Sequence, residues 1–236
     1  MESARHSVIA NNLANVNTTG FRKDLAVVEA RNAEAVEDGL FAYATPMDAM
    51  GGGALVSETY TNTMQGPIHV TNNPFDFAIE GKGFFPVTDG AGVSYTRAGT
   101  FVRDKEGRLA MPDGIHFLAS ASGNPVTVPL EGELSVAGDG TIAADGSAVG
   151  KIDVVAFANE RALRKIGANL YASTGETPAV YAGRIEQGAL EMSSVSPAEE
   201  LSKMILASRG YEMNMQFIRM QDQTLADLVT LARMPM

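Results

Sequence analysis

Length, composition and charge limit the classes of protein to which this chain can belong. It has 236 residues, 45% of them hydrophobic, which is enough for one domain with extensions or for two small domains. Its formal net charge of -10 argues against a nucleic-acid-binding protein, because such a surface needs clustered Lys and Arg. Cysteine is absent, so disulfides and cysteine-based metal sites are excluded. No stretch approaches the roughly 20 apolar residues of a membrane span, and the first residues lack the apolar segment of a cleavable secretory signal.

The first element that the sequence predicts is a short helix at residues 7–16. Ile9, Leu13 and Val16 lie on one stripe of this helix, which is the spacing of an amphipathic helix. The Asn and Thr residues that follow, ending in Gly20, predict its end, since Gly adopts the left-handed conformation of a helix C-terminus without steric cost. We treat residues 1–21 as one N-terminal segment that carries this helix and an Asn-rich motif.

Residues 22–67 contain few large apolar side chains and three consecutive glycines at 51–53. This composition predicts an extended linker, with at most a helical turn or two between Leu25 and Val36. Such a segment buries too little apolar surface to form a domain of its own. We therefore expect it to connect the N-terminal segment to the domain that follows.

From residue 68 to residue 192 the apolar spacing changes to a period of two. In residues 75–79 the large apolar side chains Phe75, Phe77 and Ile79 alternate with Asp76 and Ala78. Short runs of this kind are separated by turn sequences such as Asp89–Gly92. Many short strands with little helix between them predict an all-β domain of antiparallel strands.

Residues 193–236 predict one long amphipathic helix. Ser196, Pro197 and Glu199 supply an N-cap, a first-turn proline and a capping-box partner. From Leu201 to Ala232 the positions at alternating steps of three and four are apolar except for Ser208 and Asp222, and this is the spacing of a coiled-coil seam. Such a helix is roughly 55 Å long, whereas a globule of this chain length is only about 45 Å across. We therefore expect the helix to project and to need another helix to cover its apolar stripe.

Together these elements predict an α+β fold, in which a central all-β antiparallel domain is flanked by N- and C-terminal helices that pair as a coiled-coil-like module. A core helix in an all-helical domain is the alternative for the C-terminal helix. The middle of the sequence is not helical, which favours the projecting helix.

No set of residues has the spacing of a catalytic or metal site. His6, His69 and His116 are the only histidines, and they match no zinc-binding motif. The glycine pair Gly81 and Gly83 lacks the third glycine and the following helix of a phosphate-binding loop. We therefore predict no catalytic, cofactor-binding or metal-binding residue, no cofactor and no enzyme activity.

The Asn-rich motif at residues 10–21, ANNLANVNTTGF, is unusual for a helix, because Asn side chains compete for backbone hydrogen bonds. Amides buried between helices exchange hydrogen bonds that fix register, so Asn11 and Asn15, one turn apart, are candidates for specifying how subunits pack. The alternative is that both are exposed helix caps.

This motif closely resembles the N-terminal signature of the flagellar rod and hook family, the axial proteins of the bacterial flagellum. Three further stretches look like other hallmarks of that family, in the same order. They are residues 73–85 (NPFDFAIEGKGFF), residues 95–101 (YTRAGTF), and the tail that starts at Ser194 and Val195 and includes Met204, Ile205 and residues 209–212. The resemblance spans nearly the whole chain.

The resemblance implies a structural subunit of the flagellar basal-body rod, located in the periplasmic space and exported by the flagellar type III apparatus without a cleavable signal peptide. It implies helical assembly, with the terminal helices forming the inner layer of a tube around the export channel and the β-domain outside. The implied partners are further copies, other rod and hook subunits and the export apparatus, with no nucleic acid and no membrane span. The short linker favours the proximal rod protein over a distal rod or hook subunit.

We expect contacts between subunits to be made by apolar residues of the two helices and by the two Asn residues of the motif. These residues are Ile9, Leu13, Val16, Asn11, Asn15, Leu201, Met204, Tyr211, Met215, Ile218, Leu225 and Val229.

A rival hypothesis from another class is a secreted carbohydrate-binding or hydrolytic β-domain with an oligomerisation helix. It would need an exposed aromatic platform or a carboxylate pair across a cleft. The chain has no Trp, and Tyr95, Tyr171 and Tyr181 form no obvious row. A cytoplasmic scaffold is a third hypothesis.

Overall fold

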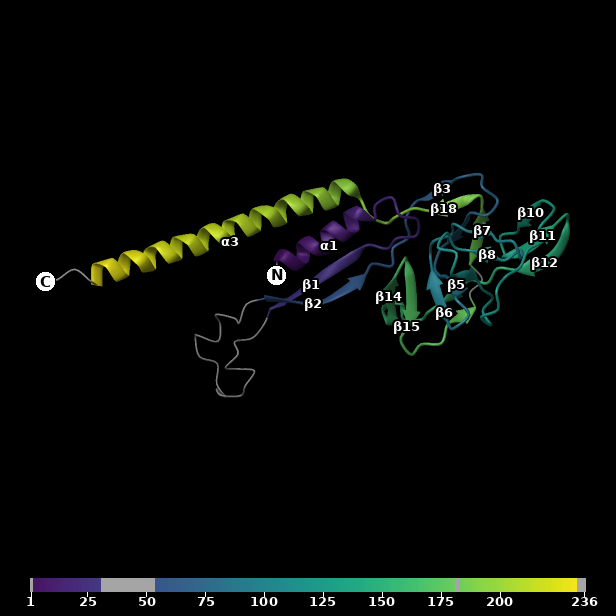
Figure 1. Cartoon of the computed structure of the whole chain (residues 1–236), viewed down its shortest axis with the longest axis horizontal. Coiled ribbons are helices and arrows are strands. Elements are labelled where there is room, and N and C mark those ends of the chain that lie inside the picture. The colour runs from purple at the N-terminus through teal and green to yellow at the C-terminus, as the bar shows by residue number, and fades with distance from the viewer. Residues whose placement is uncertain (1, 31–53, 181–182, 233–236) are drawn as a thin grey trace. The chain divides into compact units, whose positions relative to one another are not determined.

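The computed structural model describes residues 2–30, 54–180 and 183–232, which fall into two compact units (Figure 1). Of these residues, the first unit holds 2–14, 24–30, 54–60 and 196–232, and we call it the helical unit. The second, the β-unit, holds 15–23, 61–180 and 183–195. The chain passes between the two units at four places, after residues 14, 23, 60 and 195.

The largest sheet of the β-unit has seven strands in the order β14-β15-β6-β5-β9-β8-β7, and its pairings are antiparallel. Its strands are short because turns interrupt them. Between β5 and β6, for example, the Asp89 carboxylate accepts the N–H groups of Ala91 and Gly92. In chain order the strands are β5 (Phe85–Thr88), β6 (Val93–Thr96), β7 (Val102–Arg103), β8 (Leu109–Ala110), β9 (Phe117–Leu118), β14 (Leu163–Gly167) and β15 (Leu170–Ser173).

The other described strands of the β-unit form smaller antiparallel sheets. One has the order β10-β11-β12, and three are pairs, β13-β16, β17-β4 and β18-β3. A 3-10 turn, η2 (Glu160–Ala162), precedes β14. The strands are β3 (Ile68–Val70), β4 (Phe77–Glu80), β10 (Leu134–Val136), β11 (Thr141–Ala144), β12 (Ser147–Lys151), β13 (Val155–Ala156), β16 (Ala179–Val180), β17 (Arg184–Gln187) and β18 (Ala189–Glu191).

The core of the β-unit is built around Phe77, Phe85 and Phe101, all of which are almost fully buried. The Phe85 ring meets the Phe101 ring edge-on, with centroids 5.8 Å apart, and the Phe77 centroid is 6.1 Å from that of Phe101. Such tilted and edge-on aromatic pairs add stabilisation to the burial of their area. The sequence motifs at residues 73–85 and 95–101 therefore pack against each other in one core.

The helical unit contains α1 (Glu2–Ala14), α3 (Pro197–Ala232) and a two-stranded sheet of β1 (Asp24–Ala30) and β2 (Ala54–Thr61). α1 contacts both α3 and β1, and α3 continues well beyond α1 (Figure 1). Both strands lie in the segment whose composition predicts a linker. The Val, Thr and Tyr residues of β1 and β2 are good strand formers, and pairing of the two strands satisfies their backbone groups.

The predicted fold class was wrong. The chain is mainly β-strand in several antiparallel sheets, with two α-helices in the described ranges, and the helices do not pair as a coiled-coil-like module. In the described ranges α1 spans 13 residues, about 20 Å, and α3 spans 36, about 54 Å. A coiled coil needs apolar packing over several turns on both helices. Here the contacts between α1 and α3 include polar pairs, such as His6 Nε2 with Ser208 Oγ at 3.0 Å.

Candidate assembly surface

The N-terminus of α3 contains the signals that start a helix. Pro197 is its first residue, and the N–H of Glu200 donates to the C=O of Ser196 at 3.0 Å. Glu199 and Glu200 lie in the first turn, where the helix dipole favours carboxylates. One turn further on, Lys203 Nζ lies 2.6 Å from Glu199 Oε1. These local interactions fix where the helix begins, and the helix then runs to Ala232.

Most of the α3 residues predicted to form the interface are exposed. The side chains of Leu201, Tyr211, Met215, Ile218 and Leu225 are each at least 36% exposed. Met204 is half-buried, and the side chain of Val229 lies outside the described part of the chain. This row of exposed apolar side chains makes α3 a candidate surface for contact with another protein.

The predicted residues of the N-terminal segment are more buried. Ile9 is buried in the helical unit, whereas Asn11 is exposed. Leu13, Asn15 and Val16 are half-buried, and the last two follow the end of α1 at Ala14. The side-chain oxygen Oδ1 of Asn15 accepts a hydrogen bond from the Thr18 hydroxyl at 3.2 Å, and the Asn11 amide lies 3.4 Å from the Asp24 carboxylate.

Asn12, which the sequence analysis did not select, connects three elements of the helical unit. Its amide nitrogen donates to the Asp24 carbonyl at 2.8 Å and to Glu200 Oε2 at 3.2 Å, and its side-chain oxygen accepts the Asp24 N–H at 2.9 Å. Both Asn12 and Glu200 are 1% exposed. The amide therefore ties α1 to β1 and α3 at one buried point. The signal in the sequence was its position three residues after Ile9, on the same face as that apolar side chain.

A second row of exposed apolar residues on α3 was also missed. We call the row formed by Met204, Tyr211, Met215, Ile218 and Leu225 the first stripe. The second stripe consists of Leu206, Met213, Phe217, Met220 and Leu228, which are 58–67% exposed. At about 100° per residue, the centres of the two stripes lie about 140° apart around the helix. Met213, Phe217 and Met220 follow steps of four and three, whereas Leu206 and Leu228 lie seven and eight residues from the nearest of them. The sequence prediction included one seam only.

A buried ionic cluster in the β-unit joins the N-terminal motif to the strands. Glu191, at the end of β18, lies 3.0 Å from both Arg22 Nη2 and Arg97 Nη1, and all three side chains are at most 3% exposed. Glu191 also accepts the N–H of Gly66 at 3.0 Å. Burial lowers the pKa of Arg97 to about 10, the Glu191 carboxylate opposes this shift, and the charge of Arg22 adds to it. The cluster therefore joins four segments of the chain, at residues 22, 66, 97 and 191, at one point.

Two glycines of the motifs allow the backbone to approach closely within the β-unit. Gly20 has a φ of 66°, the left-handed conformation expected there, and donates its N–H to the Glu191 carbonyl at 2.7 Å. A Cβ at Gly99 would lie 1.6 Å from the Phe77 carbonyl oxygen, and one at Gly20 would lie 2.4 Å from the backbone at Ala98. No other residue fits at either position, which explains why both motifs contain Gly.

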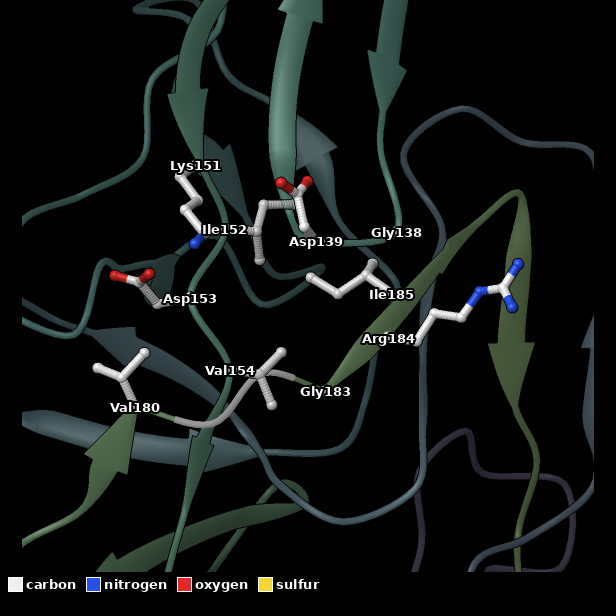
Figure 2. Close-up of a pocket in the computed structure, with 10 residues that line it drawn as sticks. All are labelled: Gly138, Asp139, Lys151, Ile152, Asp153, Val154, Val180, Gly183, Arg184 and Ile185. Atoms are coloured by element: carbon white, nitrogen blue, oxygen red, sulfur yellow. The ribbon is translucent and has the colours of Figure 1, made fainter.

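The β-unit also contains a hollow of about 370 Å³ beside β12 and β17 (Figure 2). Three of its four charged side chains, those of Asp139, Asp153 and Arg184, have local partners. The Asp139 carboxylate accepts the N–H and hydroxyl of Thr141, which lower the pKa of Asp139 below its ordinary value. Asp153 accepts the N–H of Ala121 at 2.8 Å, and Arg184 lies 3.8 Å from the Glu80 carboxylate. We assign no ligand to this hollow.

Within residues 2–30, 54–180 and 183–232, no group of three or more His, Asp and Glu side chains could hold a metal ion. Over the same residues, no helix is both long and apolar enough to cross a membrane. Among the described residues, the long apolar rows of α3 are the candidate surface for interaction with another molecule.

Comparison with known families identifies the class. Residues 2–22 match the family described as "Flagella basal body rod protein", residues 78–146 match "Flagellar hook protein FlgE/F/G D1 domain", and residues 186–231 match "Flagellar basal body rod FlgEFG protein C-terminal". These three ranges include the signature at the N-terminus, part of the β-unit and most of α3.

Curated relatives are similar to this chain over almost its full length. The chain is 34% identical over 247 residues to the flagellar basal-body rod protein FlgG of Bacillus subtilis, covering 96% of this chain and 92% of that protein. It is 34% identical to the flagellar basal-body rod protein FlgF of Caulobacter vibrioides, covering 92% and 86%, and 36% identical to FlgG of Borreliella burgdorferi, covering 92% and 89%. The chain belongs to the family of flagellar basal-body rod proteins, and the resemblance seen in its sequence is confirmed. The family is structural, so the chain is not an enzyme.

Proposed function

We propose that this chain is a structural subunit of the flagellar basal-body rod, which assembles with further copies and with other rod and hook subunits through α1 and α3. The observation that carries the proposal is the exposed first stripe of α3 in a member of the rod family. Burying each large apolar side chain of such a stripe contributes about 1.5–3 kcal/mol, which supplies the driving force for assembly. The relatives include rod proteins of both FlgG and FlgF type, so the proposal concerns the rod as a whole.

A deletion strain of the host bacterium tests this role. Loss of the chain should abolish the hook and filament while the export gate remains intact, and the full-length chain supplied in trans should restore them. Electron microscopy of purified basal bodies, together with an immunoblot for the chain, provides the measurement. A deletion strain that still builds a complete hook and filament would contradict the proposal.

The same proposal includes export by the flagellar type III apparatus to the periplasmic part of the rod, without removal of a signal peptide. The support is the match of residues 2–22 to the rod family, since this segment carries the family's N-terminal signature. N-terminal sequencing of the chain from purified basal bodies, compared with the chain from the cytosol, should give the same first residues. A shortened N-terminus in the basal-body sample would contradict export without removal of a signal peptide.

A further inference from the structure

We propose that Asp145, in the turn between β11 and β12, converts spontaneously to isoaspartate, so that this turn is a site of covalent modification in the folded chain. The reaction needs only water, and it does not depend on the function proposed above. It starts when the backbone nitrogen of the next residue attacks the Asp carboxyl group. Gly is the residue that obstructs this attack least, because it has no side chain.

The reaction makes the side chain of Asp145 part of the backbone. The Gly146 nitrogen forms a bond to Cγ of the protonated carboxyl group, and the carboxyl OH leaves as water together with the proton of the N–H. The product of this step is a five-membered succinimide ring. Water then adds to the backbone carbonyl carbon of Asp145, and the bond from that carbon to the Gly146 nitrogen breaks, which gives isoaspartate. Addition of water at Cγ instead restores aspartate.

The chain contains several Asp-Gly pairs, and the structure separates them by the hydrogen bond of the Gly N–H. Four pairs lie in the described ranges, and a fifth, Asp38–Gly39, lies outside them. In three of the four, the Gly N–H donates a hydrogen bond, from Gly90 to Thr88 Oγ1 at 3.2 Å, from Gly114 to the Met111 carbonyl at 3.0 Å and from Gly140 to the Ala137 carbonyl at 2.9 Å. A nitrogen held in this way cannot turn toward Cγ until its hydrogen bond breaks.

The carboxylates of the same three pairs are also held in place. Asp89, Asp113 and Asp139 each accept two or more hydrogen bonds from residues that follow the Gly. Hydrogen bonds to a carboxylate favour its charged form. Ring closure needs the protonated form and a side chain that is free to rotate, so these three sites are protected twice.

The Asp145–Gly146 pair differs from the other three in both groups. None of the described residues accepts a hydrogen bond from the Gly146 N–H, and the Asp145 carboxylate accepts one, from the N–H of Glu133 at 3.2 Å. Both residues of the pair are exposed, so water can reach the ring. A Cβ on Gly146 would meet nothing within 4 Å, which leaves room for the ring to form.

The turn itself lies at the edge of a sheet and is able to open. Asp145 and Gly146 have φ values of 50° and 80°, and they join Ala144 to its strand partner Ser147 in a two-residue hairpin. This left-handed conformation is less stable for Asp than for Gly. β12 is an outer strand of its three-stranded sheet, and all five of its residues are exposed. Few contacts therefore hold the turn closed while the Asp145 side chain rotates toward the nitrogen.

The modification should change the pairing of β11 with β12. Isoaspartate adds one carbon atom to the backbone of the turn, whereas a two-residue hairpin requires a defined backbone conformation at both of its residues. We therefore expect the pairing of Ala144 with Ser147 to weaken in modified molecules. Hydrogen exchange of residues 147–151 should be faster in an aged sample than in a fresh one.

Peptide mass spectrometry tests the modification. The purified full-length chain is kept at neutral pH in water labelled with heavy oxygen, and samples are digested over several weeks. Electron-transfer fragmentation locates isoaspartate and the label at each Asp, and the label enters whichever way the ring opens. We expect both to accumulate at Asp145 at least about tenfold faster than at Asp89, Asp113 or Asp139, because those sites must first break two or more hydrogen bonds. A rate at Asp145 no greater than at the other three would overturn the inference.

The chain unfolded in guanidinium chloride is the control for the effect of sequence alone. All four sites then keep their Asp-Gly pair but lose their hydrogen bonds, so their rates should become similar. Asp145→Asn is the matched variant, because Asn-Gly suits a two-residue hairpin and loses ammonia through the same ring. Circular dichroism checks that this variant folds. An amide at position 145 that persists in the folded variant, but is lost in the unfolded one, would show that the folded turn prevents ring closure and would also overturn the inference.

Discussion

Glu191 connects residues that sequence analysis had no means to pair. Its carboxylate contacts Arg22 in the segment after the N-terminal motif, Arg97 in the stretch at 95–101, and the N–H of Gly66. The motifs themselves could be recognised in the sequence, because their order and residue types resemble a family. The contacts that their residues make could not be predicted, because an ion pair between residues far apart in the chain leaves no periodic pattern in the sequence.

Replacing Glu191 by Gln should destabilise the β-unit by about 3–5 kcal/mol, because two buried guanidinium groups would lose their carboxylate. Urea unfolding of the purified chain, followed by circular dichroism, measures the change. Glu186→Gln removes an exposed carboxylate from the neighbouring strand β17 and should change stability by less than about 0.5 kcal/mol. Equal effects of the two substitutions would show that the buried cluster contributes nothing specific.

The stability of the β-unit depends on pH through Asp104. Burial alone would raise the pKa of Asp104, but the N–H and guanidinium of Arg108 and the N–H of Glu106 donate to its carboxylate and lower the pKa below its ordinary value of about 4. The unfolded chain then binds the proton more tightly than the folded chain. The stabilisation is therefore present above about pH 4 and is lost as the pH falls through the lower, folded value.

Asp104→Asn should consequently lower the melting temperature at pH 7, and its difference from the natural chain should shrink as the pH is lowered below about 4. Thermal unfolding measured from pH 7 to pH 2.5 gives both curves. Glu131→Gln, at another exposed acidic position of the β-unit, serves as the control. A difference that stays constant down to pH 2.5 would show that ionisation of Asp104 is not the cause.

The ends of helices could be predicted from the sequence, whereas the contacts between elements far apart in the chain could not. The start of α3 at Pro197 follows from residues that are adjacent in the sequence, and Gly20 has the expected left-handed conformation after α1. The strands β1 and β2 were not expected, because they pair across more than twenty residues of intervening sequence and their stability depends on that pairing. Likewise, the polar contacts between α1 and α3 could not be distinguished from coiled-coil packing by the spacing of residues alone.

Leu225→Asp should leave the β-unit folded and abolish assembly, because it places a charge where the first stripe becomes buried. Circular dichroism and thermal unfolding of the purified chain report on folding, and the recovery of hooks in a complemented deletion strain reports on assembly. Gln223→Asp introduces the same charge on the polar face and should assemble. Hooks formed by Leu225→Asp in normal numbers would show that the first stripe is not an interface.

At the scale of the whole molecule, stability should be unevenly distributed in the monomer. The β-unit has a continuous buried core, whereas the residues of α3 from Tyr211 to Leu228 are all exposed. A solvated helix without tertiary packing opens easily, so its amides are poorly protected from exchange.

Hydrogen exchange on the dilute monomer should therefore be fast for residues 211–228 and slow for the core strands β5 and β6. In assembled basal bodies the same residues of α3 should exchange much more slowly, because neighbouring copies cover them. Mass spectrometry of peptides from both samples provides the comparison. Full protection of this segment in the dilute monomer would mean that the helix does not depend on neighbours.

The four passages of the chain between the helical unit and the β-unit have a mechanical consequence. Two bodies joined by a single tether can swivel freely, since the bonds of one peptide segment rotate. Four covalent connections do not allow free rotation, because turning one unit would wrap the connecting segments around one another. A complete rotation of one unit against the other would therefore wind four backbone segments together instead of one.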